Sequence, residues 1–339
     1  MPTVSLIIPV YNVQNYLVAC LDSVLSQTHK DFECICINDG STDSSPAILQ
    51  EYAQRDSRII VISQQNKGVS EARNVGLKIA KAPYIQFLDP DDMLHPQALE
   101  ILYGIIAQHD VDFVQCNCIR VQENFRLESP ASVDIPQNFQ LSRNVLDDFF
   151  KHKKNKQEFV WLRIYKAPTI RGGGIVFPSN VHPVEDGVYT IQVMSVAKSA
   201  IFIPEQLVYY RQHTASVMSK GLTSTYINSH FRAGEILHQY ISDHKGLTAK
   251  QKRSVQKFIA RKIFHPIRKT MHTVNSEPEK KTMLAELRQR LLELEKRGVF
   301  VPSDLRLRNR LAAVGFLRGY FRFANMILLN AYLYERPPQ

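Results

Sequence analysis

Short apolar segments alternate with helical segments through the first 120 residues, and this alternation restricts the possible folds more than any other feature. The apolar segments are typical of buried strands and span residues 4–10, 32–38, 58–63, 83–88 and 111–117. The residues between them are predicted to form helices over 14–28, 43–55, 70–81 and 96–108. Strands that are joined through helices pair in parallel. The sequence therefore predicts an α/β fold with a parallel, doubly wound sheet.

Polar clusters directly follow the first four of these strands. They are PVYN at 9–12, NDGSTD at 38–43, QNKG at 65–68 and DPDD at 89–92. In a parallel sheet ligands bind at the carboxyl ends of the strands, which lie along one edge. Each cluster alone is also compatible with a turn, and Asp91 or Asp92 could cap the helix expected to start near Pro96. Four clusters on one edge favour a binding site.

The composition is that of a soluble globular protein with one large or two medium domains, since 44% of the 339 residues are hydrophobic and 22% are charged. No run approaches the roughly 18 apolar residues of a transmembrane helix, and no signal peptide is evident. We therefore expect a cytoplasmic protein. Cys34/Cys36 and Cys116/Cys118 lie in predicted strands without His or Cys at zinc-site spacing, which favours buried small apolar groups.

The second half of the chain is less regular. Residues 200–219 are expected to contain two short strands, and the chain is helical from about Tyr226 to its end. Residues 226–339 hold 22 Lys and Arg against nine Asp and Glu, whereas residues 1–225 hold 20 against 23. The basic part is expected to meet an anionic partner.

Several motifs together resemble the family 2 glycosyltransferases of the GT-A fold, especially bacterial enzymes that build surface polysaccharides. They are SLIIPVYNVQNYLVACLDSVLSQTHKDFECICINDGSTDSS, NKGVSEARNVGL, YIQFLDPDDML and VEDGVY. The resemblance implies a GT-A (Rossmann-like, nucleotide-diphospho-sugar transferase) domain over 1–222. Its nucleotide-sugar half would span about 1–120 and its acceptor half about 120–222. The mainly α-helical region 223–339 lies outside the resemblance.

The carboxylates of FLDPDDML suit a divalent cation, because Mg²⁺ and Mn²⁺ prefer oxygen ligands and neutralise a departing diphosphate. Asp89 and Asp91 form a D-x-D pair. The resemblance implies that Asp91 contacts the metal, Mn²⁺ or Mg²⁺, and that Asp89 lies nearer the ribose or a metal-bound water. Asp92 would either support these ligands or cap the following helix.

The same resemblance implies a nucleotide-sugar site on the neighbouring strand ends. Asp39 would accept the N3–H of a uracil ring, Tyr11 would stack on the base, and Pro9 would shape the strand end beside Asn12. The residues expected along the diphosphate are Asn66 and Arg73, with Lys67 as a further candidate. The segment YYRQHTASVMS (209–219) resembles the family's closing segment, whose candidates here are Arg211, His213 and Ser216.

An inverting transfer also needs a base that takes the proton of the acceptor hydroxyl. In the family this role belongs to the aspartate of an E-D pair, which here is Glu185-Asp186. We expect Asp186 to be the catalytic base, on a loop that faces the acceptor. The alternative is an acidic cap of the helix that begins at GVYTIQVM.

The predicted activity is therefore the transfer of a sugar from a nucleotide sugar, a UDP-sugar by the resemblance, to a growing bacterial glycan such as capsule or lipopolysaccharide. Trp161 is the only tryptophan, so the Q-x-x-R-W sequence of processive synthases is absent and a single addition is expected. Two alternatives stay open, a non-catalytic nucleotide-sugar-binding protein of the same fold and a sugar nucleotidyltransferase. The second would need a glycine-rich basic loop after the first strand.

The apolar, arginine-rich segment 305–338 has two interpretations. The first is an interfacial helix on the cytoplasmic face of the inner membrane, which would suit a lipid-linked glycan acceptor. Alternatively it packs on the catalytic domain with its arginines in water. No nucleic-acid-binding motif is present, so nucleic acid is not expected as a partner. The sequence does not indicate an oligomeric state.

Overall fold

The computed structural model describes residues 1–128, 131–136, 138–151, 157–213, 222–274 and 276–319, together with Ala324 and Ile327. The chain divides into two compact units, Met1–Lys220 and Gly221–Gln339. We call them unit 1 and unit 2.

Unit 1 is built on a nine-stranded sheet, within the described residues, whose strands follow the order β3-β2-β1-β4-β8-β6-β9-β5, with β7 also paired to β9. Its first part is parallel and consists of β1 (Val4–Val10), β2 (Phe32–Asn38), β3 (Ile59–Ser63) and β4 (Tyr84–Phe87). All residues of β1 and β2 are buried, as continuous apolar runs in parallel sheets require. The predicted strands and their parallel pairing are therefore confirmed for this part.

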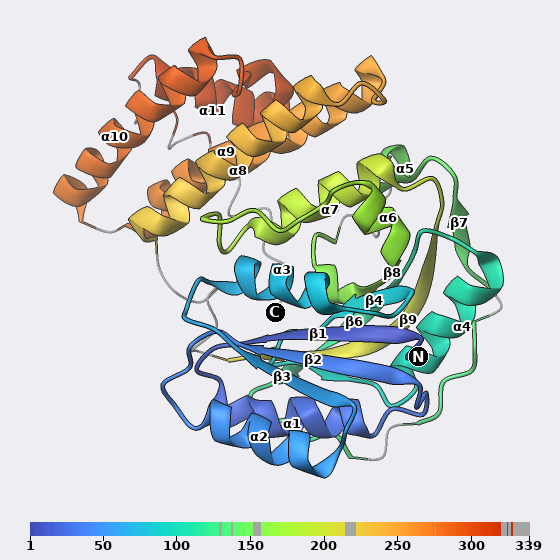
Figure 1. The fold of residues 1–339 in the computed structure, drawn as a ribbon. Coiled ribbons are helices and arrows are strands. Elements are labelled where there is room, and N and C mark those ends of the chain that lie inside the picture. The colour runs from blue at the N-terminus through green and yellow to red at the C-terminus, as the bar shows by residue number, and fades with distance from the viewer. Residues whose placement is uncertain are drawn as a thin grey trace. The chain divides into compact units, whose positions relative to one another are not determined.

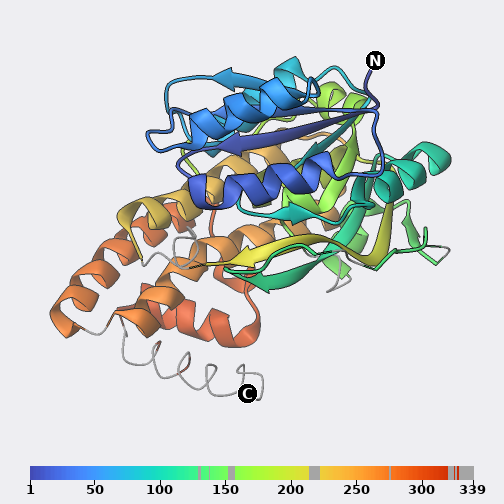
Figure 2. The same cartoon turned by 90° about the horizontal axis from the view of Figure 1, so that it is seen from below.

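Helices cover both faces of the sheet (Figure 1). They are α1 (Gln14–Leu25), α2 (Ser45–Arg55), α3 (Val69–Ile79), α4 (Ala98–His109) and α7 (Glu185–Val196). Helices α1, α2 and α4 share one core with Leu6 and Ile8 of β1, and Figure 2 shows the two blue helices α1 and α2 lying along the strands. On the opposite face α3 comes so close to β1 that a Cβ on Gly76 would lie 2.4 Å from Ile7 Cγ2.

The second part of the sheet is mixed, which corrects the wholly parallel prediction. Strand β8 (Arg163–Lys166) lies antiparallel between β4 and β6 (Phe113–Gln122), and β5 (Met93–Leu94) and β7 (Gln140–Ser142) run antiparallel to β9 (Ala200–Gln212). A parallel return needs a crossover, which is usually a helix. The described residues between β6 and β8 contain β7, a short helix α5 (Val145–Lys151) and a 3₁₀ turn at Val160–Leu162. The chain does not return to the end of the sheet where β6 begins, so β8 runs antiparallel to β6.

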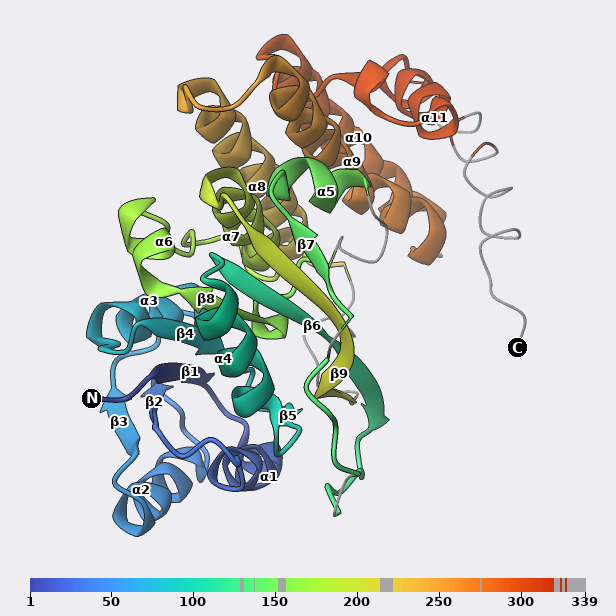
Figure 3. The same ribbon diagram turned by 90° about the vertical axis from the view of Figure 1, so that its right-hand side faces the viewer.

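Strand β9 is a single long strand, although the sequence predicted two short ones. Pro204 lies within it, and the pairing of β9 with β6 shifts register between Gln115 and Cys118 at the same level. Such bulges let a strand continue past a residue that cannot donate to the ladder. Figure 3 shows β6 and β9 side by side, with β7 along β9.

The cysteine interpretation is confirmed for the buried strand positions. Cys34 and Cys36 lie in the core with their sulfur atoms 3.7 Å apart, and Cys116 is also buried. All five cysteines are free thiols.

Unit 2 contains the helices α8 (Ser224–Asp243), α9 (Ala249–Thr273), α10 (Glu277–Lys296) and α11 (Leu307–Leu317) among its described residues. A capping box between Thr248 and Gln251 starts α9, and Gly234 of α8 lets α9 approach so closely that a Cβ would lie 2.6 Å from Ile263 Cδ1. Within the described part of the chain, no helix combines the length and the apolar character needed to cross a membrane.

Candidate active site

The loops that follow β1 and β2 are tied together through Asn12. The side-chain Oδ1 of Asn12 accepts a hydrogen bond of 2.8 Å from the backbone amide of Thr42. The backbone amide of Asn12 donates one of 3.1 Å to Ser41 Oγ. Asn12 has a φ of 49°, a left-handed conformation that asparagine tolerates better than most residues. Beside it Tyr11 is 48% exposed, whereas Pro9 is buried in the strand. The predicted base-binding tyrosine is thus held on a braced loop with its ring accessible.

Asp39 is a buried carboxylate that shapes the loop after β3. It accepts hydrogen bonds from Gln64 Nε2 (2.7 Å) and from the amides of Lys67 (2.9 Å) and Gly68 (2.7 Å). This loop passes so close to Gly40 that a Cβ there would lie 2.8 Å from the Asn66 nitrogen. Asn66 and Lys67 are exposed on it. The candidate nucleotide residues from three strand ends therefore form one connected edge.

The acidic residues after β4 form a compact group. Asp89, Asp91 and Asp92 each place one carboxylate oxygen within 4.8 Å of the others, and such a set of oxygen donors fits a hard divalent cation. Asp91 Oδ2 lies 2.9 Å from Nε2 of His213. Oδ2 of Asp92 is buried without a hydrogen-bond partner, which leaves one acceptor in the group unsatisfied.

Asp92 does not cap the following helix, so that interpretation was wrong. Helix α4 begins at Ala98 after Gln97, which makes no side-chain capping bond, and β5 lies between Asp92 and the helix. Asp92 instead accepts a hydrogen bond of 2.9 Å from the Arg211 amide. Burial, reinforced by the charges of Asp91 and Asp89, raises the pKa of the Asp92 carboxyl well above its ordinary value.

Arg211 holds the backbone around the acidic group, which differs from its expected place on a diphosphate. Its guanidinium group is buried and donates to the carbonyl oxygens of Asp91 (3.0 Å), Glu123 (2.5 Å) and Phe125 (3.1 Å). The predicted partner Ser216 lies outside the described residues. His213 does lie at the site, through its contact with Asp91, and its ring centroid is 4.3 Å from that of Tyr16.

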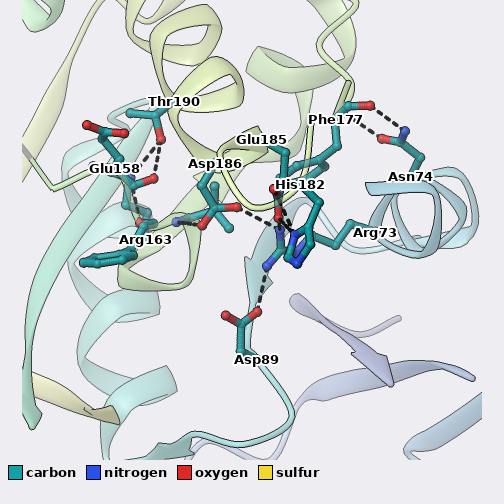
Figure 4. Close-up of polar contacts among 12 residues, drawn as sticks. Arg73, Asn74, Asp89, Glu158, Arg163, Phe177, His182, Glu185, Asp186 and Thr190 are labelled. Atoms are coloured by element: carbon teal, nitrogen blue, oxygen red, sulfur yellow. Dashed lines mark hydrogen bonds and ion pairs between the residues drawn. The ribbon is translucent and has the colours of Figure 1, made fainter. Parts of the chain in front are cut away.

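Arg73 joins the acidic group to the predicted catalytic pair. Its Nη2 donates a hydrogen bond of 2.7 Å to Asp89, and its Nη1 lies 2.8 Å from Asp186 and 3.4 Å from Glu185. Figure 4 shows the guanidinium group between these carboxylates, which come from two separate segments, the one after β4 and the first turn of α7. Arg73 is only 2% exposed, and although burial works to lower its pKa, the charges of Asp186, Asp89 and Glu185 raise it above its ordinary value.

Glu185 and Asp186 have pKa values that are shifted in opposite directions. Burial raises the pKa of Asp186 to about 7, against the opposing charge of Arg73. Burial also works to raise the pKa of Glu185, but the hydrogen bond and charge of His182, together with Arg73, outweigh it and lower that pKa. Neighbouring carboxyl groups with separated pKa values are typical of acid–base sites. Asp186 can therefore exchange a proton near neutral pH, while Glu185 stays ionised.

The pair occupies the first turn of α7, so the expected loop position was wrong. The preceding residues nevertheless bring it to the site. His182 Nδ1 contacts both oxygens of Glu185 (3.1 and 3.2 Å), and the amide of Val160 donates a long bond of 3.4 Å to Asp186 Oδ2. Acidic residues in a first helical turn are also favoured by the helix dipole.

Four supporting residues were missed from the sequence. Arg163 is fully buried and holds the segment before Val160 through the carbonyl oxygens of Gln157 and Phe159. Asn74 exchanges two hydrogen bonds (2.9 and 2.8 Å) with the backbone of Phe177, whose ring lies 5.0 Å from the Arg73 guanidinium carbon. Of these four, only His182 could have been found from the sequence. It lies three residues before Glu185 in VHPVED, a spacing that lets a side chain just before a helix contact the first turn of that helix.

Comparison with known proteins identifies the family. Residues 5–166 match the sequence profile of Glycosyl transferase family 2. Glycosyltransferase GlyG of Streptococcus pneumoniae serotype 4 is 30% identical over 224 residues, which are 63% of this chain and 72% of GlyG. The uncharacterized glycosyltransferase EpsJ of Bacillus subtilis is 29% identical over 265 residues, 77% of this chain and 75% of EpsJ.

A solved structure shows the same fold. The crystal structure of S. aureus TarS 1-349 in complex with UDP-GlcNAc matches with a TM-score of 0.74 at 18% identity, covering 100% of this chain and 93% of that chain. The predicted GT-A α/β fold with a helical C-terminal region is thereby confirmed. The chain belongs to glycosyl transferase family 2, as its motifs predicted, and it is a glycosyltransferase.

Proposed function

We propose that the protein is an inverting, metal-dependent enzyme that transfers one sugar residue from a UDP-sugar to a hydroxyl group of a bacterial surface glycan. Unit 1 would carry the whole reaction. The observation that carries the proposal is the link between Asp186 and Asp89 through Arg73, because it joins a proton-accepting group to a carboxylate of the group suited to a divalent cation.

Asp186 is proposed as the catalytic base. A general base works best when its pKa lies near the working pH, and burial raises the pKa of Asp186 to about 7. Its side chain is 18% exposed, so an acceptor hydroxyl can reach it, while hydrogen bonds from Arg73 and Val160 hold its orientation. Glu185 is proposed to position Arg73 and His182 beside it.

Asp91 and Asp89 are proposed to hold the cation, Mn²⁺ or Mg²⁺. When bound, such a cation neutralises the developing charge of the diphosphate leaving group. His213 holds Asp91, and Arg73 holds Asp89, so both carboxylates are oriented by a side chain in the protein. Arg211 fixes the backbone of this segment at the Asp91 carbonyl.

The donor is proposed to lie along the edge formed by Tyr11, Asn12, Asp39 and Asn66. An exposed tyrosine offers a stacking surface for a base, and the Asp39 carboxylate, which already accepts three hydrogen bonds, has about one acceptor position left for a ring N–H. S. aureus TarS, which shares the fold, has been crystallised with UDP-GlcNAc, and this supports a UDP-sugar. The family membership supports a glycan acceptor, free or lipid-linked, and a cytoplasmic site of action.

The proposal is tested by a donor screen with the full chain. UDP release would be measured for a panel of UDP-sugars and matched GDP-sugars, with Mn²⁺, with Mg²⁺ and with EDTA. The expected result is metal-dependent UDP release from one or a few UDP-sugars, with product of inverted anomeric configuration by NMR. Binding of UDP-sugars without turnover for any acceptor glycan would instead favour the non-catalytic alternative, and retained configuration would exclude direct base-assisted displacement.

A further inference from the structure

A group of basic side chains gathers where α9 meets the start of α11 in unit 2. Arg253 and Lys257 are exposed one turn apart on α9, and Arg306 and Arg310 are exposed at the beginning of α11. Burial raises the pKa of Asp304, in the turn Pro302–Asp304, and the nearby positive charges of Arg253, Lys257 and Arg310 act against this rise. Basic residues from two helices therefore surround one place on the surface.

Two leucines are exposed among these basic residues. Leu307 is 67% exposed and Leu311 is 47% exposed, and their spacing of one helical turn puts them on the same side of α11. Each leucine directly follows an exposed arginine, Arg306 or Arg310. We call Arg253, Lys257, Arg306, Leu307, Arg310 and Leu311 the basic–leucine surface.

The helix that presents the leucines is anchored. On its other side Ala312, Ala313 and Phe316 are fully buried, and Arg288 Nε of α10 donates a hydrogen bond of 2.8 Å to the Leu317 carbonyl at its end. Arg310 Nη2 also donates to the Ser303 carbonyl at 2.8 Å, which ties α11 to the turn before it. The exposed leucines are thus part of a packed helix and not of a frayed end.

From this combination we infer that the basic–leucine surface contacts an anionic lipid bilayer. Basic side chains attract anionic headgroups, and leucines on the same side of the helix enter the boundary between headgroups and acyl chains. An acidic protein segment or a nucleic acid would be attracted by the same charges. The two exposed leucines, which follow Arg306 and Arg310 in the chain, favour the bilayer, because it offers an apolar layer beneath its charged headgroups. This surface is independent of the transfer chemistry of unit 1.

The test is sedimentation of the full chain with vesicles of phosphatidylcholine containing 0 or about 30% phosphatidylglycerol. We expect binding to the anionic vesicles only, weakened by raising NaCl from about 0.1 to 0.5 M because salt screens the charges. The variant R253Q/K257Q should bind roughly tenfold or more weakly, since each basic residue near an anionic surface contributes severalfold to partitioning. The variant L307Q/L311Q should lose a similar share at constant charge.

A matched control is K281Q/K296Q, which removes two exposed charges from α10 in the same unit and should bind like the wild type. Thermal unfolding of each variant shows whether weaker vesicle binding results from the changed surface or from loss of the folded structure. Equal binding by all three variants, or equal binding to vesicles without phosphatidylglycerol, would overturn the inference. So would equally tight binding to soluble polyglutamate that L307Q/L311Q leaves unchanged, since the surface would then recognise charge alone. Loss of UDP release with intact vesicle binding would affect the proposed function and leave this inference standing.

Discussion

Arg73 Nη1 donates a hydrogen bond of 2.8 Å to Asp186 Oδ1, while Nη2 of the same guanidinium group is bound to Asp89 at 2.7 Å. A planar fork with several donors can bridge two carboxylates at fixed positions, whereas an ammonium group is a single point charge. Arg73 therefore sets the relative position of the proposed base and the proposed cation ligand.

Replacing the Arg73 guanidinium group is expected to lower the rate of sugar transfer much more than the affinity for UDP. Arg73→Lys should keep the positive charge but lose one of the two bridges, and transfer should fall by about 100-fold, the usual cost of a misplaced catalytic group. UDP affinity, measured by calorimetry, should change much less. Arg55→Lys is the control, because Arg55 is exposed on α2, where it pairs with Glu51 and lies over the Tyr52 ring. Equal losses of transfer in both variants would refute a positioning role for Arg73.

The pH dependence of transfer should report Asp186. Its pKa is raised to about 7, and a base must be deprotonated to act, so kcat/KM should fall about tenfold per pH unit below that value. Glu185 has a lowered pKa and stays ionised over this range. Initial rates from pH 5 to 9 at saturating metal measure this fall in kcat/KM. UDP binding is followed over the same pH range to separate an effect on binding from an effect on the transfer step. A flat profile between pH 5 and 7 would contradict the assignment of the base.

The sequence predicted those parts of the fold whose signals are local. Strands β1 and β2 were predicted with the bounds that the structure shows, because every position in them is buried and the pattern is unambiguous. Strand β8 has an ordinary strand composition, and its antiparallel direction depends on the route the chain takes after β6. No local signal encodes that route.

The same distinction holds for the site. The acidic group after β4 could be named from its motif, but the role of Asp92 depends on the amide of Arg211, which is remote in sequence. Arg73 was expected along the diphosphate, and no local signal marks it as buried, because an arginine in a helix usually faces solvent. Its place between Asp89 and Asp186 depends on tertiary structure, since α3 packs on β1 and β2 and the two carboxylates come from other segments.

Asp91 and Asp92 should respond differently to the same substitution. The raised pKa of Asp92 favours a neutral carboxyl group, so Asp92→Asn preserves both its charge state and an acceptor for the Arg211 amide. We expect it to retain most metal binding and transfer. Asp91→Asn removes the negative charge of a proposed ligand and should weaken Mn²⁺ binding by about 10–100-fold, the range seen even for groups that only support a ligand. Mn²⁺ titration followed by electron paramagnetic resonance measures both, and the reverse order would place the cation on Asp92.

Gly40 and Gly68 provide a matched pair for the loop that Asp39 holds. Both have positive φ, 73° and 87°, so alanine costs about 1–3 kcal/mol of backbone strain at either position. At Gly40 the added Cβ would also lie 2.8 Å from the Asn66 nitrogen, whereas at Gly68 nothing lies within 4 Å. Gly40→Ala should therefore lower the free energy of unfolding by about 1–3 kcal/mol more than Gly68→Ala and weaken UDP binding. Urea unfolding measures the free energy of unfolding and calorimetry measures UDP binding. Equal effects of the two substitutions would show that the loop around Asn66 moves to accommodate the added Cβ.

A buried histidine, His230, and a half-buried one, His265, should make unit 2 sensitive to acid. His230 Nδ1 lies 2.9 Å from the Tyr226 carbonyl oxygen, and His265 Nε2 lies 2.9 Å from the Tyr226 hydroxyl group. Burial, with the charge of Lys262 and Lys269 nearby, lowers the pKa of His230 to about 3 and contributes to lowering that of His265 to about 4.

The direction of the effect follows from proton uptake. Below the ordinary histidine pKa of about 6.5 the unfolded chain binds protons that the folded unit does not, so the free energy of unfolding falls as pH falls from about 6.5 toward 4. At pH 5 the loss is about 2 kcal/mol per histidine. Hydrogen exchange of α8 and α9 at pH 7 and 5 measures it. H230F/H265F should show a smaller decrease in protection than the wild type, after correction for the intrinsic exchange rate, and His29→Phe in unit 1 should leave it unchanged. An unchanged decrease in the double variant would assign the acid sensitivity to other groups.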